Sequence, residues 1–260
     1  ARPAVIYAAE NNNHAAEILR EKIAARLPGG FVPEDVQALN TVIGKISGVI
    51  SDASDRERLG LSPMTPGIAR AILVEEFNRI QVDRIRLPGF RRGIKTFEEK
   101  DNLLPFEEAK LYGHNAIHSV LGYLASARGL EKMAECRSDA VIMGKAREAF
   151  MGESGAGLLH RHGGSDELFT PAGFRAHAED LLERMTNPFL NDSVERVIRD
   201  PVRKLGWDDR LIGAMRLALK AGVRPVRLAE AAGLAARGIG CGDPRDLWPA
   251  EVRRTEEAET

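Results

Sequence analysis

The sequence predicts a mainly helical α+β protein, in which a short strand–helix segment and a small sheet precede a multihelical domain. Two observations support this fold class. From Leu103 onward, apolar residues recur at helical spacing almost to the end of the chain, whereas β-branched runs are confined to the first hundred residues. We therefore expect a strand–helix and mixed-sheet segment over residues 1–100, a helical domain over 101–245 and a charged tail over 246–260.

The first hundred residues begin in strand–turn–helix order. Val-Ile-Tyr-Ala at 5–8 is typical of a buried strand, although a short edge strand remains an alternative. The polar run Glu10-Asn-Asn-Asn-His14 follows, and Pro28-Gly-Gly30 stops the next helix. The remaining expectations for this part are a helix over 14–27, a short helix from Pro33, a strand within 41–50 and a loop over 51–67. Strands are favoured near both ends of 72–85, where a helix is the alternative.

The second part predicts successive helices over 104–128, 139–160, 171–186, 193–199, 208–219 and 226–236. Ser193 is placed to cap one of these helices, and Asn187-Pro188 ends the one before it. The glycines from Gly152 to Gly157 lie inside a helical pattern, so they indicate close helix packing rather than a phosphate-binding loop. Gly238-Ile-Gly-Cys-Gly242 follows a helix and predicts a terminating loop.

Composition excludes several classes of function. The 37 Lys and Arg against 38 Asp and Glu leave a net charge of −1, which argues against nucleic acid as a partner. Cys136 and Cys241 fit no metal-ligand spacing, and we expect a reduced, cytoplasmic protein without a metal. No apolar run approaches the roughly 20 residues of a membrane span, and no signal peptide opens the chain.

A polar face on the helix over 104–128 is the most informative local feature. With about 100° per residue in an α-helix, Asn115 lies roughly 140°, His118 roughly 80° and Glu107 roughly 60° from Lys110. An amine, an amide, an imidazole and a carboxylate would then share one side of the helix. These groups could move a proton and hold an oxyanion, although a merely solvated polar face remains an alternative.

Three motifs in order resemble the long-chain polyol (mannitol) dehydrogenases, in particular the branch that acts on mannitol 1-phosphate. The first is the Glu10-Asn11 pair after the opening strand, and the second is Asp101-Asn-Leu103 followed by Lys-x4-Asn-x2-His at 110–118. The third is Asn187-Pro-Phe-Leu-Asn-Asp192 with the basic segment after it. The resemblance covers nearly the whole chain, and it implies a helical domain similar to the C-terminal region of 6-phosphogluconate-dehydrogenase-like enzymes.

The resemblance also implies roles for these side chains in metal-independent hydride transfer with NAD. Lys110 would be the general base, and Asn115 and Asn11 would donate hydrogen bonds to the reacting oxygen. His118 would anchor a neighbouring hydroxyl, and Glu107 would assist proton movement. The leading substrate pair is a polyol phosphate and a ketose phosphate, mannitol 1-phosphate and fructose 6-phosphate.

A basic segment could bind the other end of this substrate. Arg196, Arg199, Arg203 and Lys204 lie within nine residues, and Arg196 and Lys204 match substrate-contacting positions in the family's motif. Guanidinium groups suit phosphate oxygens because they donate in a bidentate fork. An exposed helix balanced by Glu195 and Asp200 is the alternative, especially for Arg199 and Arg203.

The resemblance places a Rossmann domain ahead of the opening strand, and no glycine-rich loop in this chain fills its role. We therefore expect NAD to be bound mainly by an absent domain, this polypeptide alone to be inactive, and core exposed by the absence to favour self-association. Whether the gene lacks this domain, or whether the domain was left out of or cleaved from this polypeptide, stays open. The alternatives are a dehydrogenase of unphosphorylated polyols, a uronate reductase, and a non-catalytic helical binding module.

Overall fold

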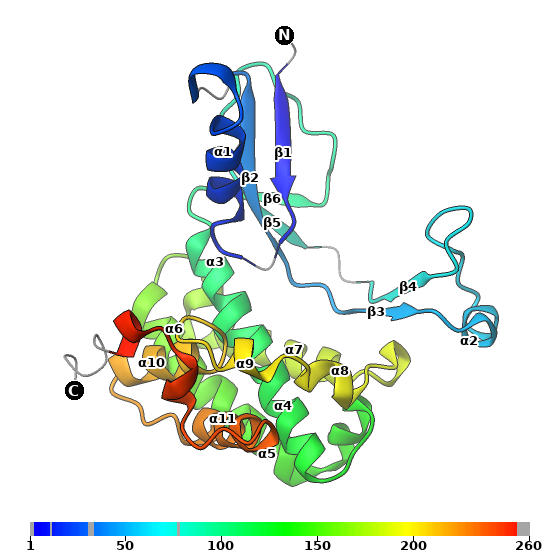
Figure 1. Ribbon diagram of the computed structural model, residues 1–260, viewed down its shortest axis with the longest axis vertical. Helices are drawn as coiled ribbons and strands as arrows, with labels where there is room; N and C mark the ends of the chain where they lie inside the picture. Colours follow the sequence, from blue (N-terminus) through cyan, green and yellow to red (C-terminus); the bar gives the residue numbers. More distant parts are fainter. Residues whose placement is uncertain (1–2, 11, 31–33, 77–78, 254–260) are drawn as a thin grey trace. The chain divides into compact units, whose positions relative to one another are not determined.

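The computed structural model describes residues 3–10, 12–30, 34–76 and 79–253, and the chain divides into two compact units (Figure 1). The first unit comprises residues 1–45 and 76–110, and the second comprises residues 46–75 and 111–260. These units follow from packing alone, so the functional division at residues 100 and 245 stays a prediction.

The first unit contains a four-stranded mixed sheet in the order β1-β2-β5-β6. β1 (Ala4–Ala8) pairs in parallel with β2 (Val36–Ile43), β2 pairs antiparallel with β5 (Ile80–Asp83), and β5 pairs in parallel with β6 (Phe97–Lys100). Helix α1 (Ala15–Ala24) connects the first two strands and packs on both, as a crossover between parallel strands requires (Figure 1). The predicted strand–turn–helix order is thus confirmed.

Two expectations for this unit are wrong. β1 is the short edge strand given as the alternative and not a buried strand, because it lies at one end of the sheet order and Ile6 is 37% exposed. The helix expected from Pro33 is replaced by β2 from Val36, whose backbone pairs with β1 and whose Leu39 and Val42 enter the core. Pairing between distant strands overrides a local helix signal here.

Asn40 joins α1 to the sheet. Its side-chain oxygen accepts a hydrogen bond from the Ala16 amide at 2.8 Å, and its side-chain nitrogen donates to Glu17 at 2.9 Å. Its backbone amide donates to the Asp83 carboxylate at 2.9 Å. A buried amide whose polar atoms are all paired holds three elements in one arrangement.

The second unit is helical. Its helices after residue 115 include α4 (Ala116–Ala127), α5 (Ala140–Arg147), α6 (Gly155–His162), α7 (Pro171–Met185), α8 (Val194–Ile198), α9 (Pro201–Lys204), α10 (Ile212–Lys220) and α11 (Val226–Gly238). The predicted helices are confirmed, except that α10 begins at Ile212 rather than near Asp208. Ser193 caps α8 by accepting from the Arg196 amide, as expected.

α4 is the central helix of this unit. Its residues Ile117, Val120, Leu121 and Ala125 are fully buried, and α5, α8 and α11 pack around it (Figure 1). Gly122 allows the close approach of α8, because a Cβ there would lie 2.6 Å from Val197. The two neighbouring helices are therefore held together by a contact that only glycine permits.

Two helical runs contain a π-helical segment. The first, Ala109–Asn115, lies between α3 (Leu104–Glu108) and α4, and the second, Glu148–Ser154, lies between α5 and α6. Ser154 Oγ donates to the Tyr112 carbonyl at 2.5 Å, and a Cβ at Gly113 would lie 3.3 Å from the Phe150 ring. The two wide turns therefore contact each other within the second unit.

A two-stranded antiparallel sheet of β3 (Ser47–Ile50) and β4 (Ala71–Val74) also belongs to this unit. Its connection contains α2 (Ala53–Arg58), capped by Asp52, where a loop was expected. Arg184 of α7 binds Glu75 through two nitrogens, at 2.6 and 2.9 Å. The strands predicted within 41–50 and near the ends of 72–85 are confirmed.

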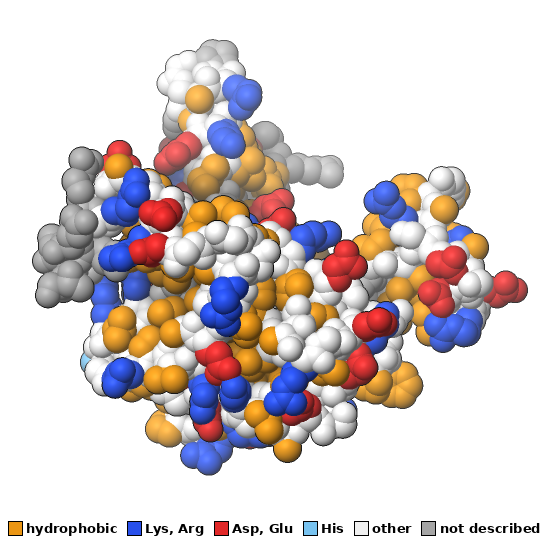
Figure 2. All heavy atoms as spheres, turned by 60° about the horizontal axis from the view of Figure 1, so that its bottom comes forward, with side chains coloured by type: hydrophobic (Ala, Val, Ile, Leu, Met, Phe, Trp, Pro, Cys, Tyr) orange, Lys and Arg blue, Asp and Glu red, His pale blue; other side chains and the backbone are white. Residues whose placement is uncertain are grey.

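No helix among the described residues is long and apolar enough to cross a membrane. In Figure 2, Lys, Arg, Asp and Glu side chains alternate with hydrophobic ones over the face of the helical unit that comes forward there. Residues 254–260 of the charged tail lie outside the described residues.

Candidate functional site

The predicted catalytic residues fall in both units. Glu107 and Lys110 belong to the first unit, whereas Asn115 and His118 belong to the second. Asn11 lies outside the described residues.

The α-helical geometry assumed for Lys110 and Asn115 is wrong, because both lie in the π-helical segment Ala109–Asn115. Backbone hydrogen bonds in a π-helix join residues five apart, so positions 110 and 115 are neighbours along one side of this segment rather than roughly 140° apart. Ser119 donates to the Asn115 carbonyl at 2.9 Å, where the α-helical pattern resumes. The angles expected from α-helical geometry therefore do not apply to this pair of positions.

Glu107 is a buried acid in an acidic environment. The residue is only 7% exposed. Burial raises its pKa to about 8, assisted by the negative charges of Asp83, Glu17 and Glu108 and opposed by Lys110. Burial also raises the pKa of Asp83. Glu107 therefore holds a proton at neutral pH that it can exchange, which an ordinary exposed glutamate does not.

His118 is linked to Arg196 through Asp192. Nε2 of His118 lies 3.2 Å from Oδ2 of Asp192, and Nε of Arg196 donates to Oδ1 at 2.6 Å. Burial alone would raise the pKa of Asp192, but its contacts with His118 and Arg196 outweigh burial and lower it to about 2. Asp192 is thus a buried, ionised carboxylate that joins the predicted hydroxyl anchor to a predicted substrate-binding arginine.

The remaining basic residues form a second group. Lys204 is 3% exposed, and burial together with the charges of Arg210 and Arg203 lowers its pKa to about 8, against the opposing effect of Asp200 and Asp209. Burying an ammonium group is costly, and a bound anion would offset part of that cost.

Arg199 and Arg203 are more exposed, and each lies 3.9 Å from Asp200. Of the four predicted basic residues, the structure therefore associates Arg196 with His118 and places Lys204 in a buried position. It leaves Arg199 and Arg203 at the surface.

Asp192 and Arg210 were not predicted as site residues, although both lie in or shortly after the third motif. In the sequence they stand out only as charged residues close to the predicted site residues. Asp192 matters through its contact with His118, and Arg210 through its charge effect on Lys204. A contact between residues 118 and 192 leaves no periodic pattern in the sequence.

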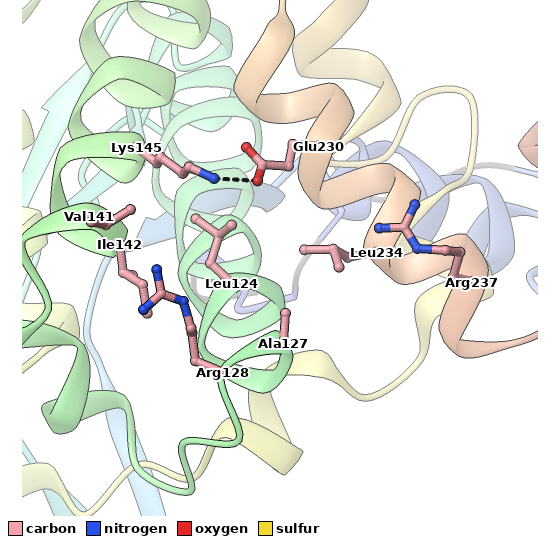
Figure 3. Close-up of a pocket in the computed structure, with 9 residues that line it drawn as sticks. All are labelled: Leu124, Ala127, Arg128, Val141, Ile142, Lys145, Glu230, Leu234 and Arg237. Atoms are coloured by element: carbon pink, nitrogen blue, oxygen red, sulfur yellow. Dashed lines mark hydrogen bonds and ion pairs between the residues drawn. The ribbon is translucent and has the colours of Figure 1, made fainter.

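A pocket of about 130 Å³ lies elsewhere, among α4, α5 and α11 (Figure 3). Leu124, Ile142 and Leu234 form its apolar part, and Lys145 binds Glu230 at 2.5 Å on one side. None of the predicted site residues lines it. Among the described residues, no group of three or more His, Cys, Asp or Glu is placed to hold a metal ion.

The model of the mannitol dehydrogenase C-terminal domain matches residues 102–238, more than half of the chain. The chain belongs to the mannitol dehydrogenase family. The family match begins at Asn102 and includes Lys110, Asn115, His118 and the whole basic segment. The resemblance inferred from the three motifs is confirmed.

Two curated members of the mannitol dehydrogenase family are each 30% identical to the chain. The mannitol-1-phosphate 5-dehydrogenase of Arthrobacter sp. (strain FB24) matches over 260 residues, which are 99% of this chain and 62% of that protein. The enzyme of the same name from Paenarthrobacter aurescens (strain TC1) matches over 237 residues, 90% of this chain and 57% of that protein. The chain thus spans about three fifths of the length of these relatives.

Solved structures show the same fold at lower identity. A D-sorbitol dehydrogenase in substrate-free form has a TM-score of 0.72 at 16% identity, covering 91% of this chain and 48% of that one. The Pseudomonas fluorescens mannitol 2-dehydrogenase, in a ternary complex with NAD and D-mannitol, has a TM-score of 0.67 at 18% identity, covering 90% and 46%. The predicted fold class, a helical domain with a small sheet as in polyol dehydrogenases, is confirmed.

Proposed function

We propose that this chain is the catalytic and substrate-binding part of an NAD-dependent dehydrogenase that interconverts a polyol phosphate and a ketose phosphate. Mannitol 1-phosphate and fructose 6-phosphate are the leading pair, because both curated relatives are mannitol-1-phosphate 5-dehydrogenases. The main support is family membership together with Lys110, Asn115 and His118, which lie on one uninterrupted helical run from Leu104 to Ala127.

In this proposal, Lys110 takes the proton of the reacting hydroxyl during oxidation and returns it during reduction. Asn115 donates a hydrogen bond to the oxygen on which negative charge develops, as Asn11 does by the family resemblance. His118 binds a neighbouring hydroxyl. NAD would accept the hydride. Gly155 and Gly157 are not assigned to NAD binding, because the space beside them is occupied by Phe174 and Leu217.

Glu107 has the properties of a proton relay for Lys110. Because its pKa is raised to about 8, both of its protonation states are accessible near neutral pH. A group of this kind can pass to solvent the proton that Lys110 receives.

The phosphate would be bound by Arg196 and Lys204, with Arg203 and Arg199 contributing charge from the surface. Arg196 uses Nε for Asp192, which leaves its two terminal nitrogens for phosphate oxygens. Lys204 supplies a buried positive charge. This pair favours a phosphorylated substrate over a neutral polyol.

The test of the function is a substrate comparison with the complete gene product that contains these 260 residues. NADH oxidation should be fastest with fructose 6-phosphate and much slower with unphosphorylated fructose or a uronate. Equal or greater rates with the unphosphorylated sugar or the uronate would replace this proposal with the corresponding alternative.

Two variants separate the chemical and binding roles. Lys110→Met should lower kcat by about 10²–10⁴-fold, because the general base is lost. Arg196→Ala should raise KM for fructose 6-phosphate by about 10–100-fold, the value of a hydrogen bond to a charged group. Arg137→Ala, which removes an exposed guanidinium paired with Glu183, serves as the control. An unchanged KM in Arg196→Ala would dismiss the phosphate assignment.

The polypeptide of residues 1–260 alone should bind NADH weakly and turn over negligibly, because Gly155 and Gly157 of its glycine-rich helical segment are occupied by packing contacts. Titration of the isolated chain with NADH, followed by fluorescence, measures this directly. Saturable quenching, or appreciable NADH oxidation with fructose 6-phosphate, would contradict it.

A further inference from the structure

The Asp192 carboxylate lies between two side chains that the proposed function assigns to substrate binding. Oδ1 accepts a hydrogen bond from Nε of Arg196 at 2.6 Å, and Oδ2 lies 3.2 Å from Nε2 of His118. The Asp192 side chain is 6% exposed, compared with 16% for His118 and 43% for Arg196. Each carboxylate oxygen therefore faces a different residue of the site, and little of the group contacts water.

The backbone holds this carboxylate in place. The Asp192 carbonyl accepts from the Met133 amide at 3.0 Å, and the Val194 amide donates to the Glu131 carbonyl at 2.9 Å. Asn191, immediately before Asp192, adopts the left-handed conformation with φ of 50°. Because these bonds run to residues 131–133, the position of Asp192 does not depend on the side chains that it contacts.

A second set of contacts fixes the elements that carry its partners. Tyr123 of α4 donates to the Ile198 carbonyl at the end of α8 at 3.1 Å, and the absence of a side chain at Gly122 lets Val197 approach α4. α4 carries His118 and α8 carries Arg196, so the separation of the two site residues is set by helix packing.

The geometry favours one protonation pattern for His118. A carboxylate facing Nε2 favours the tautomer with its proton on Nε2, which leaves Nδ1 as the ring nitrogen that can accept from a substrate hydroxyl. Nε2 and Oδ2 are both buried and lie 3.2 Å apart, and neither makes a hydrogen bond of good geometry with another group, so each is the nearest polar partner open to the other.

We propose that Asp192 is a positioning residue, which sets the tautomer and orientation of His118 and the direction of the Arg196 guanidinium. In this role Asp192 acts through these two side chains rather than on the reacting atoms. The inference deepens the proposed function and rests on it for the roles of His118 and Arg196.

The first test is independent of activity. NMR of the ¹⁵N-labelled imidazole of His118, assigned with His118→Gln, should show predominantly the Nε2-protonated tautomer. Asp192→Asn should change the ring ¹⁵N shifts, because the carboxylate is lost. Asp180→Asn is the matched control, since Asp180 also pairs with an arginine four residues later but is 55% exposed. Identical His118 shifts in folded Asp192→Asn and the parent chain would overturn the proposal.

A measurement on the unmutated chain applies if Asp192→Asn does not fold. The Nε proton of Arg196, donated to a buried carboxylate, should exchange with water more slowly than that of Arg199, whose side chain is 73% exposed. Equal exchange rates for the two arginines would also overturn the proposal.

Kinetics with the complete gene product supply the third test. Asp192→Asn should lower kcat/KM by about 10–100-fold, as loss of an orienting partner does. Asp180→Asn should leave it within about twofold. A folded Asp192→Asn enzyme as active as that control would contradict the positioning role. If the unmutated enzyme reduces none of the sugars, the proposed function is wrong. The NMR measurement of the His118 tautomer then still tests the positioning by Asp192.

Discussion

At the scale of single residues, burial decides the chemistry of the charged groups. Glu107 and Asp192 are carboxylates of similar exposure, 7% and 8%, yet their pKa values shift in opposite directions. Glu107 is surrounded mainly by other carboxylates, whereas Asp192 contacts an arginine and a histidine. The first is therefore suited to exchanging a proton, and the second to holding a fixed negative charge.

Glu107→Gln should stabilise the protein at alkaline pH. The folded-state pKa of Glu107 is raised from 4.5 to about 8, so the folded state binds more protons than the unfolded state between these values. The contribution of Glu107 to the free energy of unfolding consequently falls as the pH rises from 4.5 to about 8. Glutamine mimics the protonated acid, and above pH 8 the variant should exceed the parent by about 1–4 kcal/mol in the free energy of unfolding.

Denaturant unfolding at pH 5 and at pH 8.5 measures this difference, which should be small at the lower pH. Glu21→Gln, on the exposed side of α1, is the control. A variant no more stable than the parent at pH 8.5 would show that Glu107 is not a buried acid of raised pKa.

The identities of the site residues were readable from sequence, but their partners were not. Lys110, Asn115 and His118 could be named because they form a motif within nine residues. Asp192 could not be assigned a role, because it meets His118 only after α4 and α8 pack together. The role of Asn40 was not predictable either, because it pairs with Ala16, Glu17 and Asp83, which are distant in the sequence.

At the scale of elements, glycines decide how closely the helices approach. Gly155 and Gly157 lie at the start of α6, and a Cβ would lie 2.5 Å from the Phe174 ring at the first and 2.8 Å from Leu217 at the second. This confirms the packing role that the helical pattern predicted for these glycines. Gly152, only three residues earlier, has open space around it.

Gly155→Ala and Gly152→Ala should therefore have opposite effects. The first places a methyl group against Phe174 and the Phe150 carbonyl, which should cost about 1–3 kcal/mol. The second adds no clash and reduces the backbone freedom of the unfolded chain, so it should be neutral or stabilise by up to about 1 kcal/mol. Thermal unfolding of the two variants gives the comparison. Similar destabilisation by both would contradict the packing described for α6.

Helix existence was more predictable than helix geometry. The apolar spacing correctly located the runs over 104–128 and 139–160, because buried stripes recur with helical periodicity. It did not reveal the π-helical segments, since one wide turn barely changes that pattern. Local signals also failed at β2, which is stabilised by pairing with a distant strand.

At the scale of the whole molecule, stability should be distributed unevenly. α4 has a continuous set of fully buried residues, including Ile117 and Leu121. The β3–β4 sheet has only two strands and exposes Val49, Ile72 and Val74 on one face. Two strands with an exposed apolar face contribute little stability of their own.

Amide hydrogen exchange should reflect this distribution. The amides of α4 should exchange only through global unfolding, and those of β3 and β4 should exchange through local opening at a much lower free energy. Exchange measured over a denaturant series separates the two mechanisms. Equal protection in the two regions would show that the small sheet is part of the same cooperative unit as α4.

Fold class and family were predictable at this scale because they depend on many residues at once. The apolar pattern predicted a helical second part, and three ordered motifs predicted the family that the match over residues 102–238 shows. The arrangement into units was less accessible, since the segment 46–75 belongs with residues far along the chain through contacts such as Glu75 with Arg184.

The two tryptophans of this chain give it a built-in optical reporter. Trp207 and Trp248 have ring centroids 4.9 Å apart, and the Arg216 guanidinium lies 3.8 Å from the centroid of Trp207. Trp248 donates to the Leu205 carbonyl, the residue next to Lys204. Both tryptophan signals, the intrinsic fluorescence and the near-ultraviolet circular dichroism, therefore come from the region of the helical unit next to Lys204. Binding of a phosphate at Lys204 should change these signals, so it can be followed without an attached dye.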